Sequence, residues 1–272
     1  RANCTVNMHN LKPDYLTEAR RTATDDETFR AEFLNIRPRF TRGGFYALLN
    51  ADHHAYRATW RGDAVFSPDA TADCRGDGDV RTDVRLILGM DFGAAINSLV
   101  VCQQTGTEFR AVRNFFSKGS DGQTQDDCIA AFCAHYAPHE CREIWFMYDA
   151  TGNHTTGNTK QSKADQAATL LRERGWKVRM MTVYGTNPRH FEKYRLWERI
   201  LEEKDTRLPV FRINRDHAKE TYISMSRAQS RKGTTGDIKK WKGQERVDNK
   251  TREHATDLSD AVDNPVFVLY SE

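Results

Sequence analysis

The chain has 272 residues, of which 38% are hydrophobic and 29% charged, with a mean hydropathy of −0.75 and a formal net charge of +3. No apolar run approaches the ~20 residues of a membrane helix, the N-terminus lacks the apolar core of a signal peptide, and the net charge is too small to identify a partner. We therefore expect a polar globular protein of one domain, or of one domain and an appendage, without a membrane partner. Because the chain opens on Arg1 rather than methionine, we expect it to be a fragment of a longer protein.

The N-terminal part lacks a sustained strand pattern. Residues 14–36 have helical spacing, and residues 67–83 read as a loop rich in Gly and Asp. We therefore predict an N-terminal segment, 1–84, followed by a domain, 85–272.

From residue 85 onward strands and helices alternate. Predicted strands are 85–93, 98–104, 108–116, 143–150, 177–183 and 208–214, with a hairpin turn at Thr105 and Gly106. Predicted helices are 124–137, 162–175, 188–204, 217–230 and 257–271, with Pro265 as a candidate interruption of the last. Three antiparallel strands followed by alternating helices and strands predict an α/β fold, a mixed sheet with helices on both faces.

The cysteines show no paired spacing. They are Cys4, Cys74, Cys102, Cys128, Cys133 and Cys141. Cysteines within strand-like and helix-like runs are typical of apolar fillers in a reducing cytoplasm. A zinc site from Cys133, His135, His139 and Cys141 is an alternative, but helical periodicity in this segment favours ordinary helix and turn residues.

Acidic residues stand at three special places. Asp91 is the one acid in the apolar run "RLILGMDFGAAINSLVVCQQ" (85–104), and Asp149 ends a later strand. The stretch "HATDLSDAVD" (254–263) adds Asp257, Asp260 and Asp263 near a C-terminal helix. In open sheets the ligand site lies outside the carboxyl ends of the strands, so these carboxylates can meet there.

Several carboxylates at one place repel one another unless a divalent cation neutralises them. Oxygen ligands favour Mg²⁺ or Mn²⁺. The alternative is structural, since a strand-end aspartate often caps a turn and an acidic helix start is often only solvated.

The motifs "LILGMDFGAAINSLVV", "IWFMYDATGN" and "HATDLSDAV" together resemble the nuclease domain of the bacteriophage terminase large subunit, a member of the RNase H-like superfamily. Upstream, "ETFRAEFLN" (27–35) is similar to the segment that joins the terminase ATPase motor to its nuclease, so the resemblance covers residues from about 27 to the end. It implies an RNase H-like sheet and a metal-dependent endonuclease that cuts double-stranded DNA during viral genome packaging. It also implies the cytoplasm of an infected bacterial host as the location. The implied partners are the terminase ATPase domain, the small terminase subunit and the portal.

By position, the resemblance assigns catalytic metal ligands. Asp91 corresponds to the first ligand, Asp149 to the second and Asp260 to the third, with Asp257 as a supplementary ligand. The implied mechanism is two-metal phosphodiester hydrolysis, with ions ~4 Å apart and bridged by Asp91. One departure is "DNPVF" (263–267), where the family's helix continues without proline, so the choice among Asp257, Asp260 and Asp263 stays open.

A basic stretch follows the penultimate predicted helix. Between Arg227 and Arg246 there are seven basic residues against two acidic ones, and "RKGTTGDIKKWKG" (231–243) predicts a hairpin. The predicted DNA-binding residues are Arg227, Arg231, Lys232, Lys239, Lys240, Trp241 and Lys242. Basic residues around an aromatic side chain can follow phosphates, and no base-reading motif is present, so we expect little sequence preference. A solvated loop is the alternative, and the resemblance implies that the hairpin gates substrate access.

Other functions compete with the nuclease. "GMDFGAAINSLVV" also resembles the first phosphate loop of the actin, Hsp70 and sugar-kinase ATPases, which share the RNase H-like sheet. That class predicts a large subdomain between the two loops, yet only 58 positions separate Asp91 from Asp149. A P-loop ATPase is disfavoured because GxxxxGK[ST] is absent. A non-enzymatic DNA-binding packaging adaptor is the third alternative.

Overall fold

The computed structural model describes residue 12 and residues 14–22, 43–57, 73–155, 160–182, 187–233, 237–246 and 251–271. The chain divides into two compact units, Arg1–Thr41 and Arg42–Glu272. In the first unit, helix α1 (Tyr15–Thr22) confirms the start of the helix predicted over 14–36. The rest of that prediction, including the terminase-like residues 27–35, lies outside the described residues.

The second unit is built on a mixed sheet. Within the described residues its strands are β1 (Ala55–Tyr56), β2 (Leu86–Phe92), β3 (Ile96–Thr105), β4 (Glu108–Lys118), β5 (Glu143–Tyr148), β6 (Lys177–Thr182) and β7 (Val210–Asn214). Their order is β1-β7-β4-β3-β2-β5-β6. The β2–β3 and β3–β4 pairs are antiparallel and the other pairs are parallel. The predicted hairpin turn lies between β3 and β4, where Gly106 has a φ of 60°.

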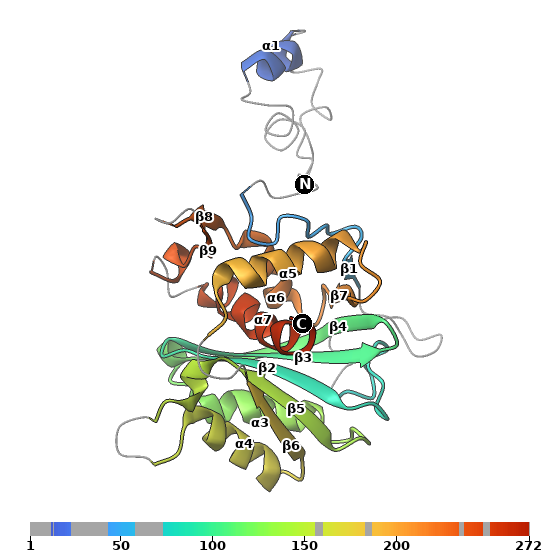
Figure 1. The fold of residues 1–272 in the computed structure, drawn as a ribbon, viewed down its shortest axis with the longest axis vertical. Helices are drawn as coiled ribbons and strands as arrows, with labels where there is room; N and C mark the ends of the chain where they lie inside the picture. The colour runs from blue at the N-terminus through green and yellow to red at the C-terminus, as the bar shows by residue number, and fades with distance from the viewer. Residues whose placement is uncertain are drawn as a thin grey trace. The chain divides into compact units, whose positions relative to one another are not determined.

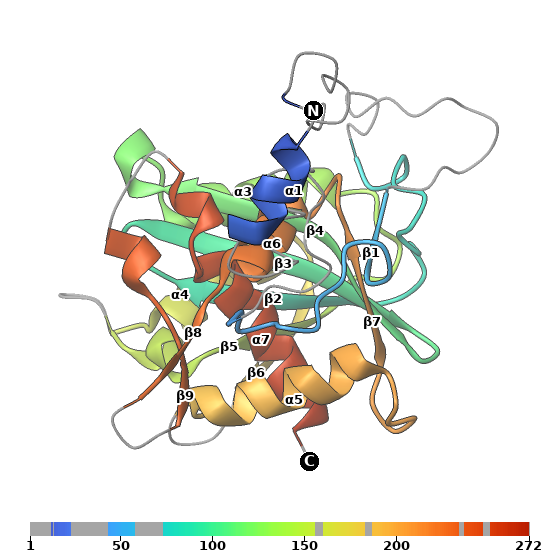
Figure 2. The same ribbon diagram turned by 90° about the horizontal axis from the view of Figure 1, so that it is seen from above.

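Helices cover both faces of the sheet (Figures 1 and 2). They are α3 (Gln125–His135), α4 (Lys163–Glu173), α5 (His190–Glu202), α6 (Lys219–Arg227) and α7 (Asp257–Tyr270). Helices α3 and α4 lie on one face, and α5, α6 and α7 lie on the other (Figure 1). A separate hairpin, β8 (Ser230–Lys232) and β9 (Ile238–Lys240), connects α6 to the segment before α7. This arrangement confirms the predicted RNase H-like sheet with helices on both faces. Among the described residues, no helix combines the length and apolar character that crossing a lipid bilayer requires.

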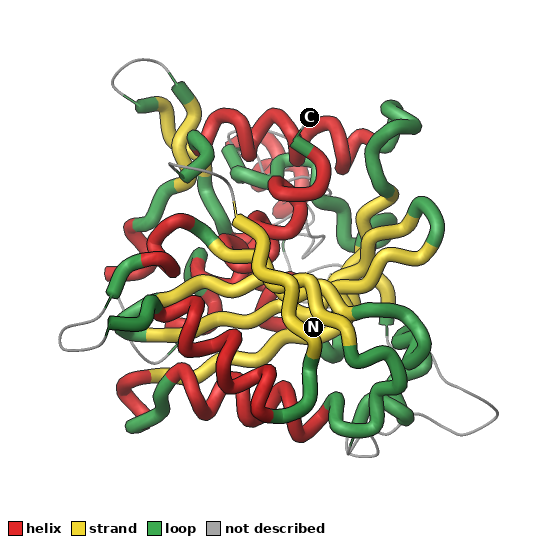
Figure 3. The backbone as a smooth tube through the Cα atoms, turned by 60° about the horizontal axis from the view of Figure 1, so that its bottom comes forward, coloured by secondary structure: helices red, strands yellow, loops and turns green. Residues whose placement is uncertain are grey.

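The side-chain alternation of β2 decides which residues face which helices. Leu86, Leu88 and Met90 belong to the hydrophobic core under α3 and α4, whereas Ile87 belongs to the core under α5 and α7. Because successive side chains of a strand point to opposite faces, Asp91 shares the face of Ile87. Figure 3 shows the sheet enclosed between these helical layers. The one acid of the apolar strand therefore points toward α7.

The predicted boundary at residue 85 is corrected by the structure, since the compact unit begins at Arg42. Strand β1 extends the sheet beside β7, and the aromatic rings of Phe45 and Tyr46 are buried in the core under α5 and α7. Farther along, buried Asp79 accepts hydrogen bonds from Tyr56 Oη at 2.6 Å and from Asn214 Nδ2 at 2.8 Å. Two-residue strands and isolated aromatic anchors carry no periodic signal, so the sequence pattern did not reveal them.

Helix α7 continues through Pro265, which therefore does not interrupt it. Proline cannot donate to the carbonyl four residues earlier, which here belongs to Ala261. That carbonyl and the Pro265 ring lie against Gly89 of β2. Asn264 also donates from Nδ2 to the Met90 carbonyl at 2.9 Å, which fastens the helix to β2 next to Asp91. The proline is thus accommodated at the closest contact between helix and sheet.

We predict that Gly89→Ala destabilises the protein strongly. A Cβ at residue 89 would lie 2.1 Å from the Ala261 carbonyl oxygen and 2.7 Å from Pro265 Cδ. Since a backbone atom blocks the space, the loss in unfolding free energy should reach the upper end of the ~1–3 kcal/mol typical of overpacking. Urea denaturation measures it. Gly106→Ala is the control: it has a positive φ but nothing within 4 Å, and should cost only about 1 kcal/mol. Equal losses in the two variants would contradict a close helix–sheet contact.

Candidate functional site

Four predicted carboxylates lie near the end of β2, close enough to influence one another electrostatically, although no three of their oxygens lie within 4.8 Å of one another. Burial raises the pKa of Asp91 well above its ordinary value, and the charges of Asp260, Asp257 and Asp149 raise it further, while Lys242 opposes them. Asp91 lies in β2 and Asp149 directly follows β5. Asp257 and Asp260 lie in the first turn of α7. The described residues donate no hydrogen bond to the Asp91 carboxylate. The structure therefore brings Asp91 into electrostatic contact with the other three aspartates, and their role as metal ligands stays a prediction.

Asp149 is held in place by the loop that it begins. It caps a 3₁₀ turn, Ala150–Asn153, and accepts a hydrogen bond from the Thr151 backbone N–H at 3.0 Å. The Thr151 hydroxyl donates to the same oxygen, and Asn187 Nδ2 donates to the other at 3.2 Å. Asp149 is thus a turn cap and at the same time a member of the acidic cluster. The loop after Asp149 thus contacts its carboxylate through Thr151.

Asp257 is the first residue of α7. Burial raises its pKa to about 6; Arg252 opposes this shift, while Glu245 and Asp260 add to it. Arg252 Nη2 donates to Asp257 Oδ1 at 2.7 Å. The other oxygen, Oδ2, is buried and has no hydrogen-bond partner among the described residues. One lone-pair-bearing oxygen is therefore available to a cation.

Asp260 lies one turn further along α7, between two ammonium groups. Lys240 Nζ lies 2.6 Å from Oδ1, and Lys242 Nζ lies 2.7 Å from Oδ2. Burial alone would raise the pKa of Asp260, but Lys240 and Lys242 outweigh it and hold the pKa well below its ordinary value. Asp260 is therefore an ionised carboxylate. Lys242 also lies 3.5 Å from Glu245, and its side chain is 47% exposed.

Asp263 has a different role from Asp257 and Asp260. Its Oδ1 accepts hydrogen bonds from Tyr46 Oη at 2.6 Å and Trp197 Nε1 at 2.7 Å, and its Oδ2 accepts one from Lys240 at 2.7 Å. With 1% of the residue exposed, both oxygens are used inside the protein. Asp263 is therefore less suited to a metal ion than Asp257, whose Oδ2 has no partner among the described residues, and than Asp260, whose Oδ2 pairs with the half-exposed Lys242. The identity of the third ligand stays a prediction.

The predicted basic hairpin exists as β8 and β9, but its lysines divide between two environments. Lys240 is wrongly placed in the predicted DNA surface, because its side chain is fully buried and donates to Tyr46, Ser259, Asp260 and Asp263. The reason is the alternation of β9, which turns Lys239 outward and Lys240 inward.

The remaining predicted DNA residues keep access to solvent. Arg227, Lys232 and Lys239 are exposed, and the Arg231 guanidinium stacks over the Trp241 ring at 4.2 Å. Their contact with DNA stays a prediction. Lys242 belongs to the edge of the acidic cluster rather than to the tip of the hairpin.

One other ligand group was missed by the sequence analysis. Among the described residues, only His53, His54 and Glu203 place three metal-ligand atoms within 4.8 Å of one another. His54 Nδ1 accepts from the Asn50 N–H at 2.9 Å, and its Nε2 lies 3.1 Å from the Leu201 carbonyl oxygen. Burial lowers the pKa of His54 to about 4, and Arg212 pairs with Glu203. Both nitrogens of the neutral His54 imidazole are therefore engaged in hydrogen bonds. The group thus has a structural role and does not offer a metal site. The cysteine and histidine set considered for zinc forms no such group in the described part of the chain.

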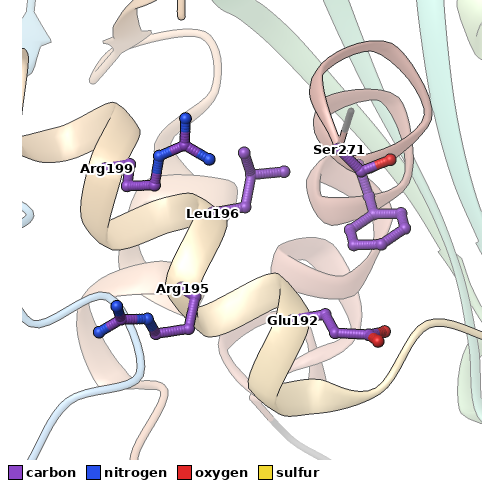
Figure 4. A pocket seen from close by; sticks show the side chains of 6 residues that line it. Glu192, Arg195, Leu196, Arg199 and Ser271 are labelled. Carbon is purple, nitrogen blue, oxygen red and sulfur yellow. The ribbon is translucent and has the colours of Figure 1, made fainter. Parts of the chain in front are cut away.

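A hollow of about 270 Å³ lies between α5 and the end of α7 (Figure 4). Glu192, Arg195 and Arg199 line it from α5, and Ser271 follows the last turn of α7. The acidic cluster is at the opposite end of α7, which at 1.5 Å per residue is about 20 Å away. This hollow is therefore separate from the candidate site.

Comparisons with solved structures identify the fold. The chain aligns with a large terminase from a thermophilic bacteriophage in complex with ATP-γ-S, at 14% identity and a TM-score of 0.52. The alignment covers 96% of this chain and 53% of that one. The chain has the fold found in a phage large terminase. The ADP complex of the same terminase gives 14% identity and a TM-score of 0.51, covering 96% and 52% of the two chains. The chain thus spans about half the length of this terminase.

A large terminase nuclease from thermophilic phage G20c with bound magnesium aligns at 13% identity and a TM-score of 0.47, covering 82% of this chain and 96% of that one. No protein-family model and no curated protein matches the sequence.

The segment between Asp91 and Asp149 distinguishes this fold from that of the competing ATPase class. Residues 92–148 are described throughout, and after the end of β2 they contain β3, β4, α3 and β5, with no inserted subdomain. An ATPase of the actin class requires a large insertion there. The structure therefore disfavours that alternative.

We predict that Lys240→Met destabilises the protein by about 3–5 kcal/mol, because removing one partner of a buried ion pair leaves charge uncompensated. Asp260 and Asp263 would both lose their shared ammonium. Lys239→Met, the neighbouring exposed position, should change unfolding free energy by no more than about 0.5 kcal/mol. Urea denaturation at pH 7 compares the two. Similar small effects would show that Lys240 is a surface residue after all.

Proposed function

We propose that the chain is a metal-dependent endonuclease domain that cuts double-stranded DNA during viral genome packaging. The observation that carries this proposal is the half-buried carboxylate of Asp91, faced by Asp260, Asp257 and Asp149, on a sheet whose fold is shared with a phage large terminase. The proposed partners are the terminase ATPase domain, the small terminase subunit and the portal, in the cytoplasm of an infected bacterial host.

The donor set fits divalent cations such as Mg²⁺ or Mn²⁺. All four side chains offer hard oxygen ligands, and Asp257 Oδ2 is buried without a hydrogen-bond partner in the described part of the chain. Mutual repulsion among the carboxylates gives a cation further stabilising energy there. We propose Asp91, Asp149 and Asp260 as ligands of two ions, with Asp257 supplementary. Bound ions of this kind lower the pKa of a coordinated water and stabilise charge on the leaving 3′ oxygen.

The protein's own side chains orient this site. Thr151 and Asn187 fix the Asp149 carboxylate, and Arg252 fixes Asp257. Lys240 holds Asp260 from the interior, whereas Lys242 holds it from the solvent side. Because Lys242 is half-exposed, its ammonium can turn toward a DNA phosphate when a cation replaces it beside Asp260.

We propose that DNA is held mainly through its phosphates. Arg227, Lys232 and Lys239 provide exposed charge, and the stacked pair of Arg231 and Trp241 provides a rigid cationic surface. Such contacts do not read bases, which agrees with cutting at little sequence preference.

The direct test is nicking of supercoiled plasmid. We expect cleavage with Mg²⁺ or Mn²⁺ and none with EDTA. Asp91→Ala and Asp149→Ala should each lower the rate on the order of 100-fold or more, because a metal ion contributes several kcal/mol to the transition state. Asp126→Ala, an exposed acid in α3, is the matched control and should cleave normally. Cleavage that resists EDTA, or that survives in both site variants, contradicts the proposal. DNA binding without any cleavage would instead support the adaptor alternative.

Metal binding should also appear in thermal stability. The raised pKa of Asp91 means that its contribution to stability falls as pH rises from the unfolded-state pKa to the folded-state pKa. At pH 7 without metal, Asp91→Asn should therefore unfold at a higher temperature, by about 3 °C for each kcal/mol gained. Mg²⁺ at ten times its Kd should stabilise the wild type by about 1.4 kcal/mol and leave Asp91→Asn unchanged. An equal Mg²⁺ shift in both proteins, measured by differential scanning fluorimetry, would show that the ions bind elsewhere.

A further inference from the structure

A second cavity lies next to the acidic cluster. It has a volume of about 320 Å³ and is lined by Ala94, Ala95, Gly119, Ser120 and Arg252. The two alanines belong to the loop that follows β2, and Gly119 follows β4 and donates its N–H to the Ala95 carbonyl at 3.0 Å. Arg252 precedes α7. The cavity therefore lies at the end of β2 and just before α7, two elements that carry the acidic cluster, and the residues after β4 complete it.

Among the described residues, Arg252 is the one charged residue that lines this cavity, and it is incompletely paired. The residue is 8% exposed. Its Nη2 donates to Asp257 Oδ1 at 2.7 Å and lies 3.4 Å from Glu245 Oε2. Its Nε and Nη1 are buried without a hydrogen-bond acceptor among the described residues. A buried donor without an acceptor costs about 1–3 kcal/mol, and more when charged, so such groups in native proteins call for a ligand.

The lining suits a compact oxyanion. Among the described residues, its lining combines guanidinium N–H donors with small side chains and the Ser120 hydroxyl, which donates to the neighbouring Asp121 carboxylate at 3.1 Å. A Cβ at residue 119 would make a tight contact of 3.2 Å with the Ala94 carbonyl oxygen, so a small residue suits this position. Ala94, Ala95 and Ser120 are exposed, so the cavity is open to solvent and a polymer can enter it. A phosphodiester has the charge, size and acceptor oxygens that complement these groups.

We propose that the Arg252 cavity binds a backbone phosphate of the DNA substrate, next to the phosphate that is cut. This assignment rests on the proposed nuclease function. Arg252 joins the two places directly, since the guanidinium that faces the cavity also holds Asp257. A phosphate seated there would position the DNA strand relative to the acidic cluster without contacting the metal ions.

The test variant is Ser120→Glu, which adds a carboxylate to the cavity and leaves Arg252 and its partners intact. The matched control is Thr107→Glu, an exposed residue in the turn at the opposite end of β3 and β4. Affinity for a 20-base-pair duplex is measured by fluorescence anisotropy in Ca²⁺ across a salt series. Losing one phosphate contact corresponds to about eightfold weaker binding at 0.1 M salt and a salt slope smaller by about 0.9. We expect both changes in Ser120→Glu and neither in Thr107→Glu.

Arg252→Lys is a second variant, which keeps the charge but loses the fork of donors, and we expect its affinity to lie between those of the wild type and Ser120→Glu. Equal affinities of Ser120→Glu and Thr107→Glu would overturn the proposal. Inorganic phosphate binding that Ser120→Glu abolishes, with DNA affinity unchanged, would assign the cavity to a free phosphate and also overturn it.

The same proteins are assayed for plasmid nicking in Mg²⁺. If the wild-type protein binds the duplex but does not cut the plasmid, the proposed nuclease function is wrong. The anisotropy comparison would still show whether the cavity binds a DNA phosphate. If the wild type cuts normally and Ser120→Glu changes neither binding nor cutting, only the phosphate-site proposal is contradicted.

Discussion

Helix α7 carries three aspartates into the protein against β2, and the contact is close because residue 89 has no side chain. The carbonyl of Ala261, left without its usual helical donor by Pro265, lies directly over Gly89. Asn264 fixes the same contact by donating to the Met90 carbonyl. This approach places the first turn of α7 beside Asp91, so one small residue determines whether carboxylates far apart in the sequence meet.

Carboxylates this close to one another need nearby cations to offset their repulsion. The described residues provide ion-pair partners for the aspartates of α7 but none for Asp91. Asp257 has Arg252, Asp260 has Lys240 and Lys242, and Asp263 has Lys240. Asp91 has no ion pair with the described residues, and its pKa is raised by burial and by the neighbouring acids. An uncompensated carboxylate beside other carboxylates lowers the stability of the empty protein. Under the proposed function, a bound cation would compensate this carboxylate.

The sequence predicted the regular elements from β2 onward because their periodicity is long enough to read. The same patterns placed Asp91 and Asp149 at strand ends, where a shared site was expected. They did not reveal β1, which has two residues, or the anchoring of Phe45 and Tyr46, which depends on contacts with distant helices. Counting charge along the hairpin treated Lys239 and Lys240 alike, although neighbouring positions of a strand face opposite ways. Arg252 gave no signal, because its importance lies in unpaired donors that only the folded chain defines.

The alternation that misled the charge count also connects the acidic cluster to the exposed face of the hairpin. On β9 and the residues that follow it, Lys240 and Lys242 meet Asp260, while Lys239 is exposed and Trp241 stacks with Arg231. One short segment therefore fixes the acidic cluster on one side and presents cationic and aromatic groups on the other. Because Lys240 is locked by Asp260 and Asp263, the exposed side of the hairpin cannot shift without disturbing α7. If DNA binds to this hairpin, the buried ion pairs of Lys240 would fix its position relative to the carboxylates of α7.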